Sequence, residues 1–231
     1  SPGVLPAGVS ALSIVGCRIS CTDSSGINLR AVKVYGAAEG NSISGTATIG
    51  VIAASQNSRI AGNTVALSSG AHTSYIDCCI QVLGNNVEVV ENVVSRTTSD
   101  PTFSCIYVSS GLREVKVSGN KITSVGASSG IYAQSSYYLS VLGNTIINSS
   151  ASNTVTGIEV SSLGRASITG NIIKLYKTVL SGDEYAGVGI KVSGSNELAV
   201  SGNTVYSLSS LDISSSTASS VDGNTFNSNF T

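Results

Sequence analysis

A short phrase, repeated along nearly the whole chain, constrains the fold more than any other feature of the sequence. Residues 115–122 show it most fully: two alternating valines, a Gly-Asn pair, and one further apolar residue. The pair returns at 40–41, 62–63, 143–144, 170–171, 202–203 and 223–224, with degenerate copies at 16–17 and 91–92. Successive copies lie between 21 residues (Asn203 to Asn224) and 32 residues (Asn171 to Asn203) apart. This spacing is typical of a solenoid with one copy per coil.

Three apolar patterns in each repeat indicate three short strands. Two flank the Gly-Asn pair, and the residue three positions after the corner glycine is apolar in all nine copies. The third pattern, a small residue and then alternating apolar residues, precedes the pair, as at 130–133 and, in the first copy, at 26–29. Alternation with period two and β-branched residues predicts strands with one buried face. We therefore predict an all-β parallel β-helix of about nine coils, in which each strand pairs with its counterpart in the next coil.

The asparagine of the repeated pair has a structural explanation. Asn tolerates the left-handed conformation that a tight bend requires, and its amide can bond to the amide in the next coil. We expect these asparagines to form a ladder that fixes the register of the coils, rather than a ligand site.

Composition excludes several classes of partner. Only 11% of the residues are charged and the net charge is −1, so the chain has no basic surface for nucleic acid. No apolar stretch is long enough to span a membrane. The five cysteines lack the paired spacing and the histidines of a zinc site, so we expect no metal and no cofactor. Cys79 and Cys105 occupy equivalent places in successive repeats, and we expect them to form a buried stack of thiols rather than a disulfide.

The length of the chain reflects the number of coils, because a repeat array grows by adding coils. We expect one domain covering residues 1–231, as part of a longer protein. Uncapped coils expose strand edges that invite pairing with other chains. Flanking domains or partner chains, as in a homotrimer, are therefore expected to cover the ends.

Variation in repeat length is confined to one corner of the predicted coil. The interval from the first strand to the corner glycine stays between 11 and 13 residues, whereas the interval from the corner asparagine to the next strand runs from 8 (Asn203 to Leu211) to 19 (Asn171 to Ile190). Insertions on one side of a solenoid often mark its binding face. The two longest loops there cover residues 67–77 and 174–187.

The strand that follows these loops carries a row of outward-facing positions. Sugar rings pack well on aromatic faces, because a tyrosine supplies apolar area while its hydroxyl stays in water. We therefore expect an extended polysaccharide to lie along this row, with Tyr107, Tyr132, Gln81 and the loop residue His72 as binding residues. From the first coil to the last, the row reads Asn28, Ile52, Gln81, Tyr107, Tyr132, Glu159, Lys191 and Asp212.

The phrases at 130–133 and 141–146 resemble those of the pectate-lyase-like superfamily, which includes pectate lyases, polygalacturonases and phage tailspikes. The resemblance covers nearly the whole chain and implies a right-handed parallel β-helix with a glycan cleft along the first strand of each coil. The aspartate clusters and groove arginine of pectinolytic members are missing here. The resemblance is therefore closest to a phage tailspike or a similar depolymerase, and it implies an extracellular protein, on a virion or secreted.

Two catalytic mechanisms fit the row. In a hydrolase, Glu159 and Asp212 lie two coils apart, about 9.6 Å on the parallel-strand spacing. This is near the upper end of the range of about 6.5 to 9.5 Å that an inverting glycosidase needs. Asp183 or Glu184 on the longest loop could replace either carboxylate. In a lyase, Lys191 would neutralise a uronate while Tyr132 or His72 removes the adjacent proton.

Simpler explanations stand beside these. Glu159, Lys191 and Asp212 also fit an exposed ladder of alternating charge, as Glu88 and Lys116 do on the next strand. The loop residues His72, Asp183 and Glu184 also fit solvated loops, and Tyr137–Tyr138 fits a subunit contact as well as a sugar site. We expect a polysaccharide hydrolase or lyase, and the alternatives are a non-catalytic glycan-binding module and a structural spacer.

Overall fold

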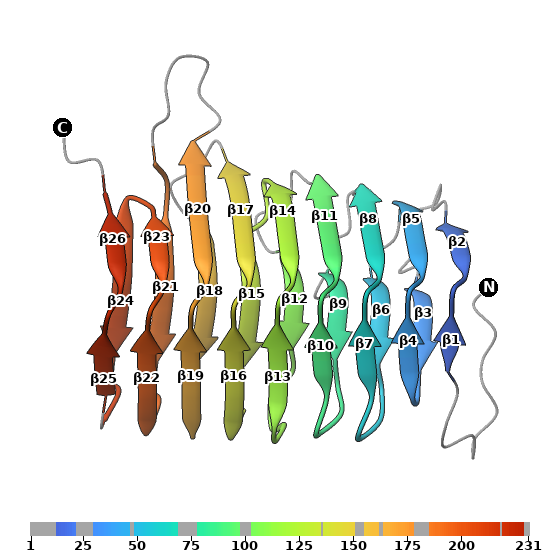
Figure 1. Ribbon diagram of the computed structural model, residues 1–231, viewed down its shortest axis with the longest axis horizontal. Coiled ribbons are helices and arrows are strands. Elements are labelled where there is room, and N and C mark those ends of the chain that lie inside the picture. The colour runs from blue at the N-terminus through green and yellow to red at the C-terminus, as the bar shows by residue number, and fades with distance from the viewer. Residues whose placement is uncertain are drawn as a thin grey trace.

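A computed structural model describes residues 13–21, 30–46, 49–68, 78–97, 103–134, 136–150, 155–161, 164–177, 185–217 and 219–228. Every regular element within these ranges is a β-strand, and the strands form three parallel sheets. The chain visits the sheets in turn, and each strand pairs with its counterparts one coil before and one coil after. The structure is therefore the predicted right-handed parallel β-helix (Figure 1).

The three sheets are named here by their place in the coil. Sheet A precedes the Gly-Asn corner and contains β1 (Ile14–Val15), β4 (Ala37–Glu39), β7 (Arg59–Ala61), β10 (Glu88–Val90), β13 (Val115–Ser118), β16 (Tyr138–Leu142), β19 (Arg165–Thr169), β22 (Glu197–Ser201) and β25 (Ser219–Asp222). Sheet B follows the corner and contains β2 (Arg18–Cys21), β5 (Ser42–Thr46), β8 (Thr64–Ser68), β11 (Val93–Thr97), β14 (Lys121–Val125), β17 (Thr145–Ser150), β20 (Ile172–Lys177), β23 (Thr204–Tyr206) and β26 (Thr225–Asn227). Sheet C closes the coil and contains β3 (Arg30–Val34), β6 (Ile49–Ala53), β9 (Cys78–Val82), β12 (Ser104–Val108), β15 (Ser129–Gln134), β18 (Thr156–Ser161), β21 (Val188–Ser193) and β24 (Ser209–Ser214).

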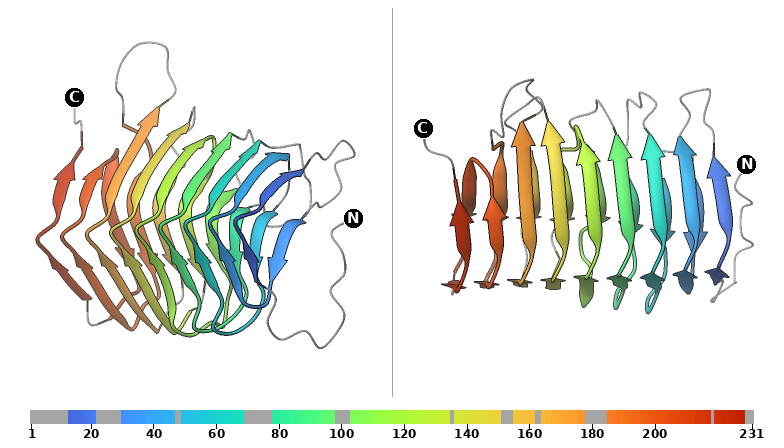
Figure 2. Two further views of the ribbon diagram at one scale, coloured as in Figure 1. Left: turned by 45° about the vertical axis from the view of Figure 1, so that its right-hand side comes forward. Right: turned by 45° about the horizontal axis from the view of Figure 1, so that its top comes forward.

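The three sheets enclose the axis of the stack (Figure 2). Buried apolar side chains from all three sheets form one core. The apolar residue three positions after each corner glycine points into it, and from Ile43 to Val205 this column is at most 1% exposed. One coil cannot bury such a residue alone, and the neighbouring coils complete the cover. The predicted third strand is thereby confirmed.

The asparagine ladder is confirmed from Asn41 to Asn224. In each step the side-chain oxygen of one asparagine accepts hydrogen bonds from both the backbone N–H and the side-chain amide of the asparagine one coil earlier, as between Asn120 and Asn144 at 2.9 Å. The amide also donates to a backbone carbonyl, Val117 O in the case of Asn144. One detail of the prediction is wrong: the left-handed residue is the glycine before the asparagine, with φ near 60°. In the degenerate copy at 91–92, Glu91 takes that conformation. A glycine adopts this conformation without the Cβ clash that other residues meet.

The first coil differs from the prediction. The predicted strand at 26–29 lies outside the described residues. The strand that pairs with β6 is Arg30–Val34. Lys33, not Asn28, therefore precedes Ile52 in the outward row. The interval from Val32 to the corner glycine Gly40 is 8 residues, shorter than the predicted 11 to 13, because Val34 is followed at once by the corner at Tyr35 and Gly36.

All five cysteines are free thiols. Cys78, Cys79 and Cys105 are fully buried, and Cys79 and Cys105 lie in neighbouring coils of sheet C. Burial raises the pKa of Cys79 well above its ordinary value and that of Cys105 to about 12. The expected buried thiols are confirmed, and their raised pKa values make them poor nucleophiles.

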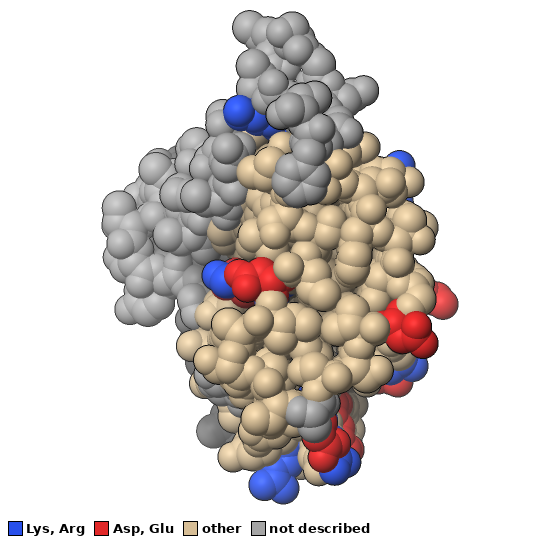
Figure 3. Space-filling model, turned by 90° about the vertical axis from the view of Figure 1, so that its left-hand side faces the viewer, with Lys and Arg blue, Asp and Glu red and all other residues tan. Residues whose placement is uncertain are grey.

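The end of the stack that carries β24, β25 and β26 shows few charged side chains (Figure 3). Val221 and Phe226 take inward register positions beside Val200 and Val205 but are 45% and 41% exposed. They are exposed because no further coil covers them among the described residues.

Candidate functional site

The outward row of sheet C is aligned as the sequence predicts. Residues in register on neighbouring strands run from Gln81 through Tyr107 and Tyr132 to Glu159, Lys191 and Asp212. We call these six residues the sheet C row. Successive members stand about 4.8 Å apart at the backbone, because that is the spacing of paired strands. The row thus presents one side chain per coil along the axis of the stack.

The two tyrosines of the row differ in accessibility. Tyr107 is only 3% exposed, and its hydroxyl donates a hydrogen bond to Gln134 Oε1 at 3.0 Å. Burial also raises its pKa. Tyr132 is half-buried, with its ring centroid 5.6 Å from that of Tyr107. Tyr132 therefore presents the accessible ring, and Tyr107 packs beside it on the neighbouring strand.

The earlier coils of the row are partly closed. Ile52 occupies the outward register position on β6 but is 1% exposed, and every residue of β6 and β12 is buried. Gln81 between them is half-buried. The accessible part of the row consequently begins at Tyr132 and continues toward β24.

Glu159 is held by two donors. Lys191 Nζ donates to Glu159 Oε1 and Ser129 Oγ donates to Glu159 Oε2, each at 3.1 Å. The Glu159 side chain is 26% exposed and that of Lys191 is 44% exposed. Asp212, next in register to Lys191, is exposed. The predicted alternation of charge is therefore a formed ion pair followed by an exposed carboxylate.

This geometry bears on the two mechanisms differently. Glu159 and Asp212 are two register steps apart, as the hydrolase mechanism requires, and Lys191 stands between them. The lyase mechanism needs an ammonium available to a uronate, whereas Lys191 already binds Glu159. Lys191 would therefore have to leave Glu159 before it could neutralise a uronate.

Three predicted site residues lie outside the part of the chain that the structure describes. His72, Asp183 and Glu184 lie outside the described residues, so their positions relative to the row are not described. Within the described ranges, no group of three or more His, Cys, Asp or Glu side chains is arranged to hold a metal ion. The same ranges contain no helix of the length and apolar character that crossing a membrane demands.

The prediction missed the residues that hold the row in place. Ser129 and Gln134 on β15 bond to Glu159 and Tyr107, and no periodic pattern distinguishes them from other polar strand residues. It also missed a group of tyrosines at sheet B, where the ring centroid of Tyr185 lies 6.1 Å from that of Tyr176 on β20 and 6.0 Å from that of Tyr206 on β23. Tyr206 stands four positions after a corner glycine, so the repeat register marks it as outward.

The outward ion pair predicted on sheet A is confirmed. Lys116 Nζ lies 3.7 Å from Glu88 Oε1, and Arg59 extends the ladder by contacting both Glu88 and Glu39. These side chains are about half exposed, so their contribution to stability is small.

Comparison with known proteins gave one positive finding. The model of a family described as "Right handed beta helix region" matches residues 104–231. Neither the curated proteins nor the solved structures that were searched contain a match to the chain.

Proposed function

The chain belongs to the family of right-handed β-helix regions, and from this premise we propose that it binds an extended polysaccharide along the sheet C row. The observation that supports this most directly is the alignment of Tyr132, Glu159, Lys191 and Asp212, one on each of four neighbouring strands. A linear polymer parallel to the axis would meet a new side chain at each strand spacing of about 4.8 Å.

The chemistry of the row suits a sugar chain. The Tyr132 ring offers apolar area to one sugar ring, with its hydroxyl in water. The charged residues that follow can exchange hydrogen bonds with hydroxyl groups. Lys191 is compensated by Glu159, and Asp212 adds a negative charge, so the accessible row is not basic. A neutral or weakly charged glycan therefore fits better than a polyanion.

Replacing Tyr132 by alanine is expected to weaken glycan binding about tenfold, because the only accessible ring among the described residues of the row is lost. The measurement is a calorimetric titration of bacterial surface polysaccharides into both proteins. Tyr206→Ala, which removes a half-buried tyrosine from sheet B, is the matched control and should bind like the parent chain. Equal affinity of the Tyr132→Ala variant and the parent chain would remove the row from the proposal.

Hydrolysis of the bound glycan is the second candidate, favoured by the two carboxylates on alternate strands of the row. In this mechanism one of Glu159 and Asp212 protonates the leaving oxygen and the other activates water. Lys191 and Ser129 hold Glu159 in a fixed position, which suits the residue that orients the water.

Asp212→Asn and Glu159→Gln are each expected to lower the rate of release of reducing ends by at least about a hundredfold. Binding of the glycan should persist in both variants. A reducing-end assay measures the rate, and ultraviolet absorbance of the product separates hydrolysis from elimination, which leaves an unsaturated sugar. Ser44→Asn, at an exposed position of sheet B, is a control that leaves the row unchanged. Absence of product from every polysaccharide that the parent chain binds would identify a pure binding module.

An extracellular setting follows from this proposal, because bacterial surface polysaccharides lie outside the cell. A virion tailspike or a secreted depolymerase, as a homotrimer or with flanking domains, is the form we propose for the whole protein.

A further inference from the structure

A hollow of about 500 Å³ lies on the outer face of sheet A, across β16, β19 and β22. It arises where the outward row of this sheet changes from long side chains to small ones. The small residues form the floor and continue the same register as the ion-pair ladder. From β7 to β22 that row reads Arg59, Glu88, Lys116, Ser140, Ser167 and Ala199.

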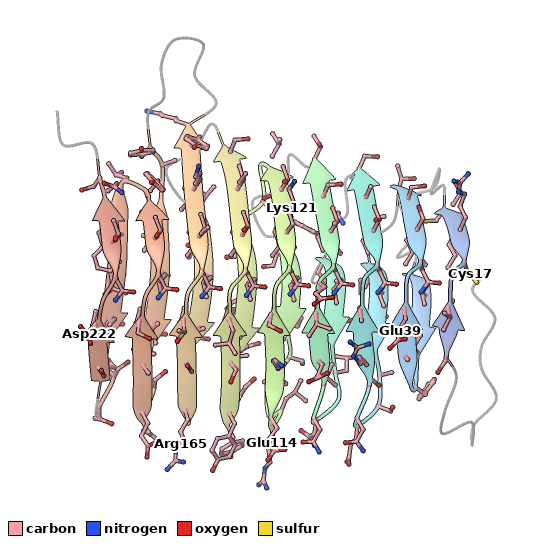
Figure 4. The ribbon with its side chains drawn as sticks, in the orientation of Figure 1. Cys17, Glu39, Glu114, Lys121, Arg165 and Asp222 are labelled. Carbon is pink, nitrogen blue, oxygen red and sulfur yellow. The ribbon has the colours of Figure 1, made fainter. Side chains whose placement is uncertain are left out.

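One wall of the hollow consists of three residues in register at the starts of these strands: Tyr138, Arg165 and Glu197. Arg165 Nε lies 2.6 Å from Glu197 Oε2, and Arg165 Nη2 donates to Glu197 Oε1 at 2.9 Å, which makes the pair bidentate. The Arg165 guanidinium also stands over the Tyr138 ring, 5.6 Å from its centroid. Figure 4 shows Arg165 at this edge of sheet A. The contacts orient the ring beside the pair.

We propose that this hollow is a second carbohydrate site, which takes a neutral sugar. Tyr138, 47% exposed, supplies the apolar surface, and the hydroxyls of Ser140 and Ser167 line the floor. The inference rests on the proposed function in that the ligand is a carbohydrate. It concerns a different sheet from the sheet C row, so the two sites engage different parts of a glycan.

The hydrogen-bonding capacity of the wall matches neighbouring hydroxyl groups. A guanidinium carries five N–H donors, and the bidentate pair uses two of them. A carboxylate has about four acceptor positions, of which the pair likewise uses two. Donors and acceptors therefore remain side by side on one wall, and a pair of vicinal hydroxyls needs both.

The charge of the wall selects against acidic sugars. Arg165 and Glu197 neutralise each other, and the floor carries no charge. A uronate would have to compete with Glu197 for Arg165 and would be repelled by the carboxylate that it displaces. A neutral sugar meets no such penalty.

The volume of the hollow is suited to a small ligand such as a sugar. Small-molecule sites typically enclose about 300 to 1,000 Å³, and this hollow lies within that range. The ion pair that borders this hollow is more than half exposed, and tyrosine and arginine are also common in protein interfaces. A second copy of the chain is therefore the competing occupant that the test must detect.

The test uses the 231-residue chain with isotope-labelled tyrosine rings, so that nuclear magnetic resonance reports Tyr138 and Tyr132 separately. Tyr138→Phe and Tyr132→Phe assign the two signals. Neutral oligosaccharides of glucose, galactose, mannose and rhamnose are titrated, with an oligouronate for comparison. At least one neutral oligosaccharide is expected to shift the Tyr138 signal saturably, and the oligouronate should bind at least about tenfold more weakly.

Filling the floor should remove this response. Ser167→Phe places a ring in the hollow at an outward strand position, and Ala199→Leu is a second variant that fills the floor if the first is poorly folded. Ser44→Phe, outward on sheet B, is the matched control and should leave the Tyr138 shift unchanged. A thermal melt of each variant confirms folding.

The outcomes separate this inference from the proposed function. A shift at Tyr132 with none at Tyr138 overturns the hollow and leaves the sheet C row standing. A shift at Tyr138 alone supports the hollow and counts against the row, and no shift at either ring overturns both. A Tyr138 signal that moves with protein concentration instead of sugar identifies a contact between copies of the chain and also overturns the inference.

Discussion

Replacing Asn144 by aspartate is expected to make the stability of the fold depend steeply on pH, with a small loss near pH 4 and a loss of several kcal/mol near pH 8. Asn144 is fully buried in the middle of the ladder. Its amide donates to Val117 O and to Asn171 Oδ1, at 2.9 and 3.0 Å. An aspartate puts an oxygen where those two acceptors expect a donor, so the charged form is repelled by both.

The sign of the pH dependence follows from this contact pattern. An unfolded aspartate has a pKa of about 3.9. Burial beside two acceptors raises the folded pKa, so the folded state prefers the protonated side chain. The variant is therefore closest to the parent protein below about pH 4 and loses stability as the pH rises through the folded pKa. A shift of about three units corresponds to about 4 kcal/mol, a large share of a typical stability of about 5 to 15 kcal/mol.

Chemical denaturation at several pH values measures this difference, with the parent chain as the reference at each pH. Asn224→Asp is the matched control, because Asn224 ends the described ladder and is partly exposed. Among the described residues its amide donates only to Val200 O. Its pH-dependent loss should be less than about a third of that at Asn144. Equal losses at the two positions would contradict the view that burial in the ladder determines the effect.

The asparagines show what the sequence alone could predict. Each step of the ladder depends on two neighbouring coils with the same residue at the same place, and a repeat makes such identity visible in the chain. The same logic aligned Tyr132 with Glu159 and Lys191, because register in a parallel stack passes unchanged from coil to coil. Features that repeat were therefore predictable, including the Glu88–Lys116 ion pair.

Features of a single coil were not predictable in this way. Tyr107 and Tyr132 occupy equivalent outward positions, yet only Tyr107 is fully covered and bonded to Gln134. Arg96 takes an inward position between Leu67 and Ser124 and is 2% exposed, with its guanidinium carbon 3.7 Å from the centroid of the Phe103 ring. Burial of this kind depends on neighbours outside the repeated phrase, and the alternation of polar and apolar residues does not report it.

The hollow on sheet A was also missed, for a related reason. The sequence marked Tyr138 as a subunit contact or a sugar site, whereas the hollow depends equally on the small Ser140, Ser167 and Ala199. Small polar residues on an outward face carry no signal of their own. Only the three-dimensional register shows that they are consecutive and that Arg165 and Glu197 border them.

Replacing Gly157 by alanine is expected to destabilise the protein by about 1 to 3 kcal/mol, although alanine is the smallest possible addition. Gly157 lies on β18. It is the small residue that precedes the alternating apolar residues of a sheet C strand, and the equivalent residues of the other coils form one column. A Cβ on Gly157 would stand 2.4 Å from Ile173 Cγ2 and 2.5 Å from the Gly189 backbone oxygen. The backbone oxygen belongs to the next coil and is held in the sheet, so the clash cannot be relieved by a side-chain rotation alone.

Gly170→Ala is the matched control, because that corner glycine has the opposite properties. Its φ is +65°, and a Cβ built there meets nothing within 4 Å. It should therefore cost about 1 to 2 kcal/mol through left-handed strain alone. Ile173→Ala removes one of the two clashes at position 157, so this change should cost less stability in the Gly157 variant than in the parent chain. Denaturation of the two single variants, Ile173→Ala and the double variant measures this coupling, and additive losses would contradict it.

In the sequence both glycines are simply recurring residues, but one is required for its backbone conformation and the other for the space above it. Cys79 and Cys105 occupy the same column as Gly157 in other coils, so the requirement belongs to the particular neighbours, Ile173 and Gly189, rather than to the repeat.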